Sequence, residues 1–430
     1  WEAVNECMSR EEREQLQLER LQATLFRVYM NVPFYRKQFD ALGIDPDSFR
    51  SIEDLSRLPF TTKDNLRASY PYDMFAVPLR EVVRIQASSG TTGLPTVVGY
   101  TKNDLKHWSN LVARLLTAGG VTQNDIVQIA FDYGLFTGAF GFHYGAERIG
   151  ASVIPISSGN TQRQIKLMQD FRTTALLCTP SYAMALSEAI LESGTPVSSL
   201  SLKYGLFGAE PWSESVRTEL QDRLKIIATD NYGLSEVMGP GVAGECLERN
   251  GLHINEDHFF VELVNPETLD PVGPGETGEL VITTLTREAF PLIRFRTRDL
   301  TRFITEPCSC GRTLMRMSKV MGRTDDMIKL RGITVFPSRI ESVLCAAAGG
   351  TPHFQIEIDR KGALDEMTIL FEVSDMLFSD EIKDLQGFMD RIRRDLESEL
   401  GFPVEVRPVE KKSLERFEGK GRRVIDRRKK

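Results

Sequence analysis

The segment ASSGTTGLPTVVGY, residues 87–100, contains five Ser or Thr residues, three Gly residues and one Pro, and follows the apolar run VVRIQ. Glycine lets a backbone approach a ligand closely, and hydroxyls with free N–H groups suit an anion such as phosphate. No Lys follows a suitably spaced Gly, so the segment is not a Walker loop, and it lacks the Rossmann fingerprint. The residues alone leave two interpretations open, a phosphate-binding loop and a polar linker.

A second set of residues could hold a metal ion. Cys308 and Cys310 flank one residue in the turn PCSCGR, and Cys246 and His253 lie seven positions apart upstream. Three thiolates and one imidazole form a donor set that binds zinc tetrahedrally. The C-x-C spacing is tighter than the usual one, so buried free cysteines beside a satisfied histidine are the alternative. Six cysteines in 430 residues are too few for a disulfide scaffold and fit a reducing compartment.

Successive patterns along the chain predict the elements that position these residues. Residues 9–45 have helical periodicity that Pro33 interrupts. From about residue 82 to residue 240, short apolar runs such as DIVQIAF and KIIATD alternate with helical stretches, which is typical of parallel strands with crossover helices. Ligands bind such sheets at the carboxyl ends of strands, where the Gly-rich segments fall. A β-rich stretch follows from His258 to Arg302.

The run GRTDDMIKLRGITVFP, residues 322–337, is interpreted as a domain boundary. Beyond it we expect a strand in the VFP region, helices at 338–348 and 379–400, and strands at 353–360, 366–374 and 403–409. This β-α-β-β-α-β order is typical of a small split module that could move as a unit. The predicted fold class is α/β, with a large N-terminal domain of parallel and mixed sheets with helices, a β-rich subdomain, and a small mobile C-terminal α+β domain.

Charge and hydropathy exclude some classes of protein. The chain has 53 Lys and Arg against 60 Asp and Glu, and its net charge of −7 argues against a nucleic-acid partner. Residues 411–430 contain ten basic and three acidic residues, a pattern of a solvated tail or of a segment that covers a polyanionic ligand. The N-terminus lacks an apolar h-region and no window of about eighteen apolar residues occurs, so we expect a cytoplasmic protein without a membrane partner.

Seven ordered segments carry a resemblance to a known family. The segment SSGTTGLPTVVGYT resembles the phosphate loop of the adenylate-forming enzymes, which include acyl-CoA synthetases, synthetase adenylation domains and luciferases. The chain is most similar to the phenylacetate-CoA ligases among them, and the resemblance spans essentially its whole length. The six further segments that agree in order and spacing are FDYGLFTGAFGFHYGAERIG, LFGAEP, NYGLSEVMGPGVAGEC, RTRDL, GRTDDMIKLRG and EGKGRRVIDRR.

The resemblance implies a two-step reaction. A carboxylic acid, phenylacetate by preference, is joined to AMP from ATP with release of pyrophosphate, and the acyl group then passes to coenzyme A. An anionic nucleophile attacks an anionic phosphate in the first step, so the site must supply positive charge. The match assigns Lys420 as the catalytic lysine, Glu236 as the Mg²⁺ ligand and Ser235 as a hydroxyl at the α-phosphate. The family more often has Thr in place of Ser235 and Lys in place of Leu94.

The same match assigns residues to ATP and AMP. Tyr232 would lie near adenine, and Asp299 would accept both ribose hydroxyls, with a surface ion pair to Arg296 or Arg298 as the alternative for Asp299. The full set of nucleotide-binding candidates is Ser88, Ser89, Gly90, Thr91, Thr92, Gly93, Gly208, Ala209, Glu210, Asn231, Tyr232, Gly233, Asp299 and Arg323.

The resemblance also divides the chain. Residues 1–322 would form the adenylate-forming domain with the ATP and acyl sites, residues 323–326 the hinge, and residues 327–430 the small domain that carries Lys420. Asp325 would be the hinge residue whose backbone torsions change. Members of the family close one way to form the acyl-adenylate and then rotate the small domain to admit coenzyme A.

We expect the acyl pocket in the segment FDYGLFTGAFGFHYG. Tyr133, Phe136 and Phe140 would supply aromatic walls and the glycines would supply room, which suits an aryl acid better than a long fatty acid. Packing of these aromatics in the core is the alternative. Rival functions are ligation of another aryl acid such as hydroxyphenylacetate or indoleacetate, loading of a carrier protein, and nucleotide sensing. By resemblance the Cys and His set is a structural zinc site, and a homodimer is expected by analogy.

Overall fold

The structure is a computed structural model whose chain divides into two compact units. The first unit contains Trp1–Cys178, Leu200–Ala209 and Ile227–Val320, and the second contains Thr179–Ser199, Glu210–Ile226 and Met321–Lys430. None of the described helices is long and apolar enough to cross a lipid bilayer. The structure describes residues 1–88, 95–135, 137–325, 328–330, 333–348, 353–361, 364–372, 382–410, 413–414 and 423–428.

The first unit begins with three helices, α1 (Ala3–Glu6), α2 (Arg10–Asn31) and α3 (Pro33–Leu42). Ser9 caps α2, since its hydroxyl accepts a hydrogen bond from the backbone N–H of Glu12 and the Glu12 carboxylate accepts one from the Ser9 backbone. Pro33 starts α3, where its missing N–H costs no helical hydrogen bond, and this confirms the predicted interruption. Short helices follow at η1 (Pro46–Ser48), η2 (Ile52–Arg57), α4 (Lys63–Ala68) and η3 (Leu79–Glu81).

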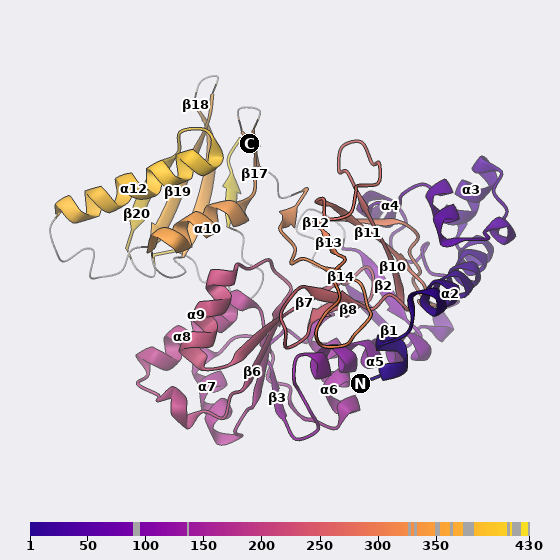
Figure 1. Cartoon of the computed structure of the whole chain (residues 1–430), viewed down its shortest axis with the longest axis horizontal. Helices are drawn as coiled ribbons and strands as arrows, with labels where there is room; N and C mark the ends of the chain where they lie inside the picture. Colours follow the sequence, from indigo (N-terminus) through magenta and orange to yellow (C-terminus); the bar gives the residue numbers. More distant parts are fainter. Residues whose placement is uncertain are drawn as a thin grey trace. The chain divides into compact units, whose positions relative to one another are not determined.

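A nine-stranded mixed sheet is the centre of the first unit (Figure 1). Strands β4, β3, β5, β6 and β7 pair in parallel, as predicted for residues 82–240, and β8, β9, β14 and β13 continue the sheet antiparallel. Helices α5 (Lys102–Ala118) and α6 (Gly138–Ile149) pack on each other and on β8, and α7 (Thr161–Asp170) follows β4. In sheet order the strands are β13 (Phe303–Ile304), β14 (Arg316–Met317), β9 (Leu252–Ile254), β8 (Gly239–Glu245), β7 (Ile227–Leu234), β6 (Tyr204–Gly208), β5 (Ala175–Cys178), β3 (Ile126–Ile129) and β4 (Ser152–Ile154).

Two smaller sheets complete the first unit. Strands β1 (Arg84–Ala87) and β2 (Val97–Tyr100) form an antiparallel pair in which Ala87 lies opposite Val97, so the Ser, Thr and Gly segment connects the two strands of a hairpin. Strands β10 (Phe259–Val264), β11 (Gly278–Thr284) and β12 (Phe295–Thr301) pair antiparallel and account for the predicted β-rich stretch.

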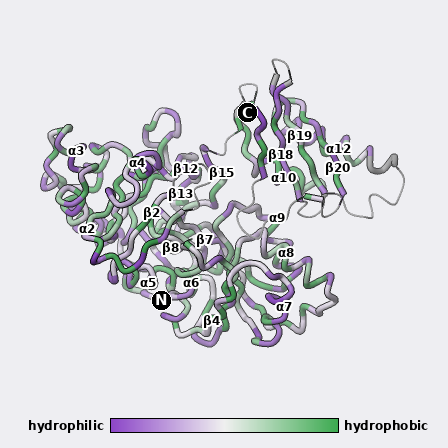
Figure 2. Tube along the Cα trace, turned by 180° about the vertical axis from the view of Figure 1, so that it is seen from behind, coloured by the Kyte–Doolittle hydropathy of each residue, from purple (hydrophilic) through white to green (hydrophobic). Residues whose placement is uncertain are grey.

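The second unit contains α8 (Pro180–Glu192), η4 (Val197–Ser199), α9 (Glu214–Leu224), β15 (Gly322–Arg323) and a C-terminal module. In the module α10 (Pro337–Ala348) and α12 (Ile382–Leu400) accompany a four-stranded sheet. Met389, Ile392, Leu396 and Leu400 are buried along α12, as their helical spacing predicts. Along β18 the hydropathy alternates from residue to residue (Figure 2). The sheet order is β20 (Glu405–Val409), β19 (Leu364–Glu372), β18 (Phe354–Lys361) and β21 (Val424–Asp426).

The strand pairing of this module differs from the sequence-based expectation. The VFP region forms β17 (Ile333–Val335), which pairs with β16 (Ile328–Leu330) in a separate two-stranded sheet. The edge of β18 is instead covered by β21, which lies within the basic stretch that the sequence indicated as a tail. Three residues between charged neighbours carry too weak a period-two pattern to predict a strand, and only the parallel pairing with β18 reveals it.

Candidate active site

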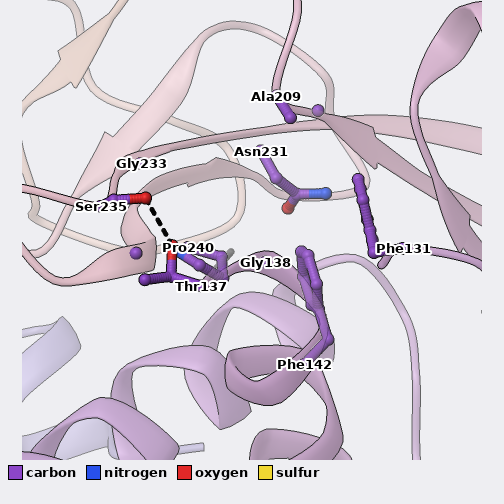
Figure 3. Close-up of a pocket in the computed structure, with 11 residues that line it drawn as sticks. Phe131, Thr137, Gly138, Phe142, Ala209, Asn231, Gly233, Ser235 and Pro240 are labelled. Carbon is purple, nitrogen blue, oxygen red and sulfur yellow. Dashed lines mark hydrogen bonds between the residues drawn. The ribbon is translucent and has the colours of Figure 1, made fainter. Parts of the chain in front are cut away.

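A cavity lies in the first unit beyond the carboxyl ends of β6 and β7 and against the first turn of α6 (Figure 3). The cavity itself has a volume of about 40 Å³, and together with the open solvent at its mouth the space is about 370 Å³. This is where parallel sheets bind ligands, because neighbouring strand ends and helix starts leave a crevice there. The residues that line the cavity are Phe131, Thr137, Gly138, Phe142, Gly208, Ala209, Asn231, Gly233, Ser235, Gly239 and Pro240.

Two glycines hold the strand ends close together on one wall of the cavity. A Cβ atom on Gly208 would lie 2.4 Å from the carbonyl oxygen of Asn231, and one on Gly233 would lie 1.9 Å from the carbonyl oxygen of Gly239. Neither position has room for a side chain, because the obstacle in each case is backbone. Ala209 follows Gly208 with φ of +70°, so the chain turns sharply as it leaves β6. The result is a flat slot lined by backbone.

Polar atoms point into the cavity from two elements. The hydroxyl oxygens of Ser235 and Thr137 lie 3.0 Å apart, which joins the segment after β7 to the start of α6 (Figure 3). The side-chain amide of Asn231 donates to the carbonyl oxygen of Phe207 at 3.1 Å, while its own oxygen is buried and has no hydrogen-bond partner in the part of the chain that the structure describes. A buried acceptor without a partner costs free energy, so a ligand donor at this point would be stabilising.

Phe131 and Phe142 form the aromatic wall of the cavity. Their rings stack with centroids 5.4 Å apart and planes 10° apart, and both rings are buried. Phe131 follows β3. Phe142 is four residues after Gly138 on α6, so Gly138 and Phe142 lie on the same face of that helix, which faces the cavity. An apolar flat wall beside a hydroxyl pair suits a ligand with an aromatic ring and a polar end.

Two of the three predicted aromatic walls, Tyr133 and Phe140, are among the described residues. Tyr133 and Phe140 contact each other edge to face at 5.3 Å and do not line this cavity. The Tyr133 hydroxyl is 3.1 Å from Nδ1 of His143, and the Arg84 guanidinium lies 4.9 Å from the centroid of Phe140. The role of these two aromatics as acyl-pocket walls therefore stays a prediction that this cavity does not support.

Two further candidates make buried polar contacts. The Tyr232 hydroxyl donates to Oδ2 of Asp299 at 2.6 Å, and both side chains are buried. Asp299 is buried rather than at the surface, and Arg296 binds Glu279, with nitrogen–oxygen distances of 2.7 and 2.9 Å. The Tyr232 phenol therefore holds the buried Asp299 side chain in place.

Glu236 forms an ion pair with Lys63, a residue that belongs to none of the sequence motifs. The ammonium of Lys63, on α4, lies 3.2 Å from Oε1 of Glu236. The Glu236 side chain is 8% exposed and the Lys63 side chain 37% exposed, so the pair lies at an opening to solvent. One nearly buried carboxylate that faces an opening fits Mg²⁺, which uses one or two carboxylates together with phosphates and water.

Cys246, His253, Cys308 and Cys310 are brought together as the sequence predicted. Their ligand atoms all lie within 4.8 Å of one another, although 62 residues separate Cys246 from Cys308. The Sγ atoms of these two cysteines are 3.8 Å apart, and Sγ of Cys310 is 3.5 Å from Nε2 of His253. Zinc–sulfur and zinc–nitrogen bonds of about 2.3 and 2.0 Å in a tetrahedron give edges of about 3.8 and 3.5 Å, so the donor set fits zinc.

Comparisons with known proteins identify the family. A family model described as "AMP-binding enzyme" matches residues 41–286, and one described as "AMP-binding enzyme C-terminal domain" matches residues 332–428. A phenylacetate-coenzyme A ligase from Thermus thermophilus is 48% identical over 99% of this chain and 98% of its own length. One from Escherichia coli is 48% identical over 98% of this chain and 96% of its own length. The chain belongs to the phenylacetate-coenzyme A ligase family.

Solved structures agree with this family. A 2-hydroxyisobutyryl-CoA ligase in the postadenylation state, in complex with 2-HIB-AMP, superposes with a TM-score of 0.92 at 29% identity and covers 99% of this chain and 92% of its own. The same ligase with 2-HIB-AMP and CoA in the thioesterification state gives a TM-score of 0.72 at 30% identity, with 98% and 91% covered. The predicted adenylate-forming fold is confirmed.

The remaining candidates of this phenylacetate-coenzyme A ligase family member fall into four groups. Gly208, Ala209, Asn231, Gly233 and Ser235 line one cavity. Ser88 lies at the base of the predicted phosphate loop, where its backbone N–H donates to the carbonyl oxygen of Thr96 at 3.0 Å. Ser89, Gly90, Thr91, Thr92, Gly93, Phe136 and Lys420 lie outside the described residues, as does Leu94.

Glu210, Arg323 and Asp325 belong to the second unit. Glu210 accepts a hydrogen bond from the backbone N–H of Ser181 at 2.7 Å. Arg323 and Asp325 form a bidentate ion pair with nitrogen–oxygen distances of 2.9 and 3.0 Å. The roles of these three residues at the phosphates and in the hinge stay predictions, as do the domain limits at residues 322 and 327.

Sequence reasoning missed Phe131, Phe142, Thr137 and Lys63. The i, i+4 spacing of Gly138 and Phe142 could have placed Phe142 on the cavity face, had the helix start at Gly138 been known. Thr137 and Lys63 have no comparable signal, because each meets its partner across a long stretch of chain.

Proposed function

We propose that this protein is an ATP-dependent, AMP-forming phenylacetate-CoA ligase. It activates phenylacetate as the acyl-adenylate with release of pyrophosphate and then transfers the acyl group to coenzyme A, giving phenylacetyl-CoA and AMP. The family membership supports the reaction class, since relatives at 44–48% identity are named phenylacetate-coenzyme A ligases. The observation that carries the substrate class is the stacked Phe131 and Phe142 wall beside the Ser235 and Thr137 hydroxyls.

Each part of the cavity has a place in the first step. The aryl ring packs on Phe131 and Phe142, which leaves the carboxylate near the hydroxyl pair. The slot at Gly208 and Ala209 takes the flat adenine, whose exocyclic amine can donate to the free amide oxygen of Asn231. These contacts hold the carboxylate oxygen and the α-phosphorus in reach of each other, which removes much of the entropic barrier.

Charge is the second requirement of the adenylation step. Glu236 would hold Mg²⁺ in reach of the phosphates, and the metal would supply the positive charge that two approaching anions need. Lys420 would add a second positive charge from the small domain at the α-phosphate and the acyl carboxylate. Asp299, fixed by Tyr232, would accept the ribose hydroxyls.

The Cys246, His253, Cys308 and Cys310 cluster would hold a structural zinc ion. Four protein ligands leave no open position for substrate or water, so the ion would have no catalytic role. It would link the turn between β8 and β9 to the segment before β14. This link would hold together one end of the nine-stranded sheet, the same sheet in which Asn231 lies on β7.

A panel of acids tests the proposal. Pyrophosphate release is measured with phenylacetate, hydroxyphenylacetate, indoleacetate and a fatty acid, each with and without coenzyme A. Phenylacetate should give the highest kcat/KM, and coenzyme A should convert the adenylate to thioester and AMP. A higher kcat/KM for another aryl acid would replace phenylacetate as the substrate. Adenylation without thioester formation would favour loading of a carrier protein.

A further inference from the structure

A second cavity lies in the first unit, between α2, α5 and the last turn of α6. It has a volume of about 210 Å³, and it shares no lining residue with the candidate active site. Gly138 lies at the active-site end of α6 and Arg148 at the other end, so about ten residues of helix, roughly 15 Å, separate the two cavities along α6. The adenylation step proposed above therefore uses none of this second cavity.

The wall of this cavity is strongly basic. Arg20 comes from α2, Lys106 and Arg114 from one face of α5, and Arg148 from α6, while Glu2 is the one carboxylate that lines it. Three segments far apart in the sequence thus bring four cationic side chains to one hollow. Like charges repel at such separations, so a cluster of cations without neutralising carboxylates or a bound anion lowers the stability of the folded protein.

Carboxylates compensate only two of the four cations. Arg114 binds Asp257 through two nitrogen–oxygen contacts of 2.8 and 2.9 Å, and it also pairs with Glu2. Arg20 lies 3.7 Å from the same Asp257. Lys106 and Arg148 have no carboxylate partner among the described residues. The wall therefore has an excess of about two positive charges, both at its open side.

The hydrogen bonds at the mouth hold one of these cations in position. Nε of Arg148 donates to Oδ1 of Asn110 at 3.0 Å, which leaves the two terminal nitrogens of the guanidinium for other acceptors. Lys106 lies one turn before Asn110 on α5, on the same face, and its ammonium can donate three hydrogen bonds. Lys106, Asn110 and Arg148 therefore line the same cavity, and Asn110 holds Arg148 there.

The titration of the neighbouring groups is consistent with a positive local potential. Burial lowers the pKa of His107, and the Arg20 guanidinium lowers it further, against the weaker opposing effects of Asp104 and Glu288. Burial also lowers the pKa of Arg20; Asp257 acts in the opposite direction, and Arg114 adds to the lowering by a smaller amount. Burial is the largest cause of both shifts, and the smaller contributions of the neighbouring cations have the sign expected where several cations lie together.

We propose that this cavity binds a phosphate-type dianion, at a site separate from the ATP site. The guanidinium of Arg148, with its flat donor array, and the ammonium of Lys106 match the oxygens of a tetrahedral oxyanion. The excess of two positive charges selects a dianion over chloride or a carboxylate. The ligand is inorganic phosphate or the phosphate group of a small phosphomonoester, since the two share this chemistry.

Binding of inorganic phosphate to the intact protein tests the site. Isothermal titration calorimetry is compared for the wild type, for Lys106→Gln with Arg148→Gln, and for the control Lys102→Gln with Arg163→Gln, which removes two exposed cations outside the cavity. We expect one saturable event whose affinity falls at least tenfold in the cavity variant and stays unchanged in the control. Equal affinity in all three proteins, or an equal loss in both variants, would overturn the proposal.

Histidine NMR separates this site from the active site. The chain has five histidines, so His107→Gln assigns the His107 ring signal. Phosphate should shift that signal with the affinity measured by calorimetry and raise its pKa, because a bound dianion stabilises the imidazolium. Binding without any shift of the His107 signal would place the phosphate elsewhere and overturn the proposal. Glycerol 3-phosphate in place of phosphate distinguishes the two sources, since a tighter fit for it identifies a phosphomonoester.

Discussion

The ammonium of Lys63 lies 3.2 Å from the carboxylate of Glu236, the residue proposed to hold Mg²⁺. The two residues are 173 positions apart in the chain, and Lys63 lies on the short helix α4. In the protein without nucleotide this ion pair neutralises a nearly buried carboxylate. A metal ion held by Glu236 would therefore compete with the lysine for the same oxygen, and the ion pair would raise the Mg²⁺ concentration that the first step requires.

Replacement of Lys63 should change the response to magnesium. In Lys63→Met, Mg²⁺ no longer displaces an ammonium, so we expect the half-saturating Mg²⁺ concentration to fall about fivefold, which corresponds to about 1 kcal/mol. Pyrophosphate release across a Mg²⁺ series measures this. Lys37→Met, an exposed lysine on α3, is the control. An unchanged magnesium curve would show that the ion pair has no part in metal binding.

Lys420 should act on the first chemical step and not on nucleotide affinity. Lys420→Ala removes the charge that would stabilise the transition state, so adenylation should fall at least 100-fold while ATP binding stays within about threefold. Pyrophosphate release and equilibrium ATP binding are measured on the same preparation. Lys203→Ala, an exposed lysine ahead of β6, serves as control. Wild-type adenylation in the Lys420 variant would refute its assignment.

The cysteine cluster should contain one zinc ion per chain. Cys308→Ser removes one of four ligands, so metal content should drop to near zero and the melting temperature should fall by about 5 °C or more. Metal analysis and calorimetry measure the two effects. Cys7→Ser changes an exposed cysteine outside the cluster and should change neither. A folded wild-type protein without bound metal would contradict this prediction.

Buried His258 makes stability depend on pH. Burial lowers its pKa from 6.5 to about 3, although Asp257 acts in the opposite direction and Arg114 contributes to the lowering. The unfolded chain takes up a proton near pH 6.5 while the folded protein does not, so stability is lost as pH falls from about 6.5 towards 3. At pH 5 this loss is about 2 kcal/mol.

Replacement of His258 isolates its contribution to the pH dependence of stability. We expect the free energy of unfolding of the His258→Gln variant to change about 2 kcal/mol less than that of the wild type between pH 7 and pH 5. Urea unfolding at both pH values gives the difference. The variant His143→Gln, at a half-buried position on α6, is the control and should follow the wild type. Parallel pH curves for wild type and His258→Gln would show that His258 takes up its proton in the folded state.

Some of the site could be predicted because its residues lie within one short segment. The NYGLSE segment contains Asn231, Gly233 and Ser235, and the end of one strand brings all three to the cavity. The Cys and His cluster could be predicted from ligand types, since few residues bind zinc. In the first case the residues are neighbours in the sequence. In the second case only a few residue types can bind zinc.

The aromatic wall could not be predicted in the same way. Phe140 and Phe142 are two residues apart on α6, which places them about 200° apart around the helix axis, so only one of them can face the sheet. The sequence presents both as equivalent aromatics in one motif. Which of them lines the cavity depends on how α6 packs on β8, and this packing is part of the tertiary structure.

The sequence by itself determined the family, the fold class and the kinds of side chain that the reaction requires, because ordered motifs and strand-helix periodicity are written in local order. The tertiary structure decided which residues meet. Lys63 reaches Glu236, Thr137 reaches Ser235, and four cations from α2, α5 and α6 line a second cavity. No local sequence pattern predicts these pairings, because a contact between residues about a hundred positions apart depends on how whole helices and strands pack and not on the spacing of residues in the sequence.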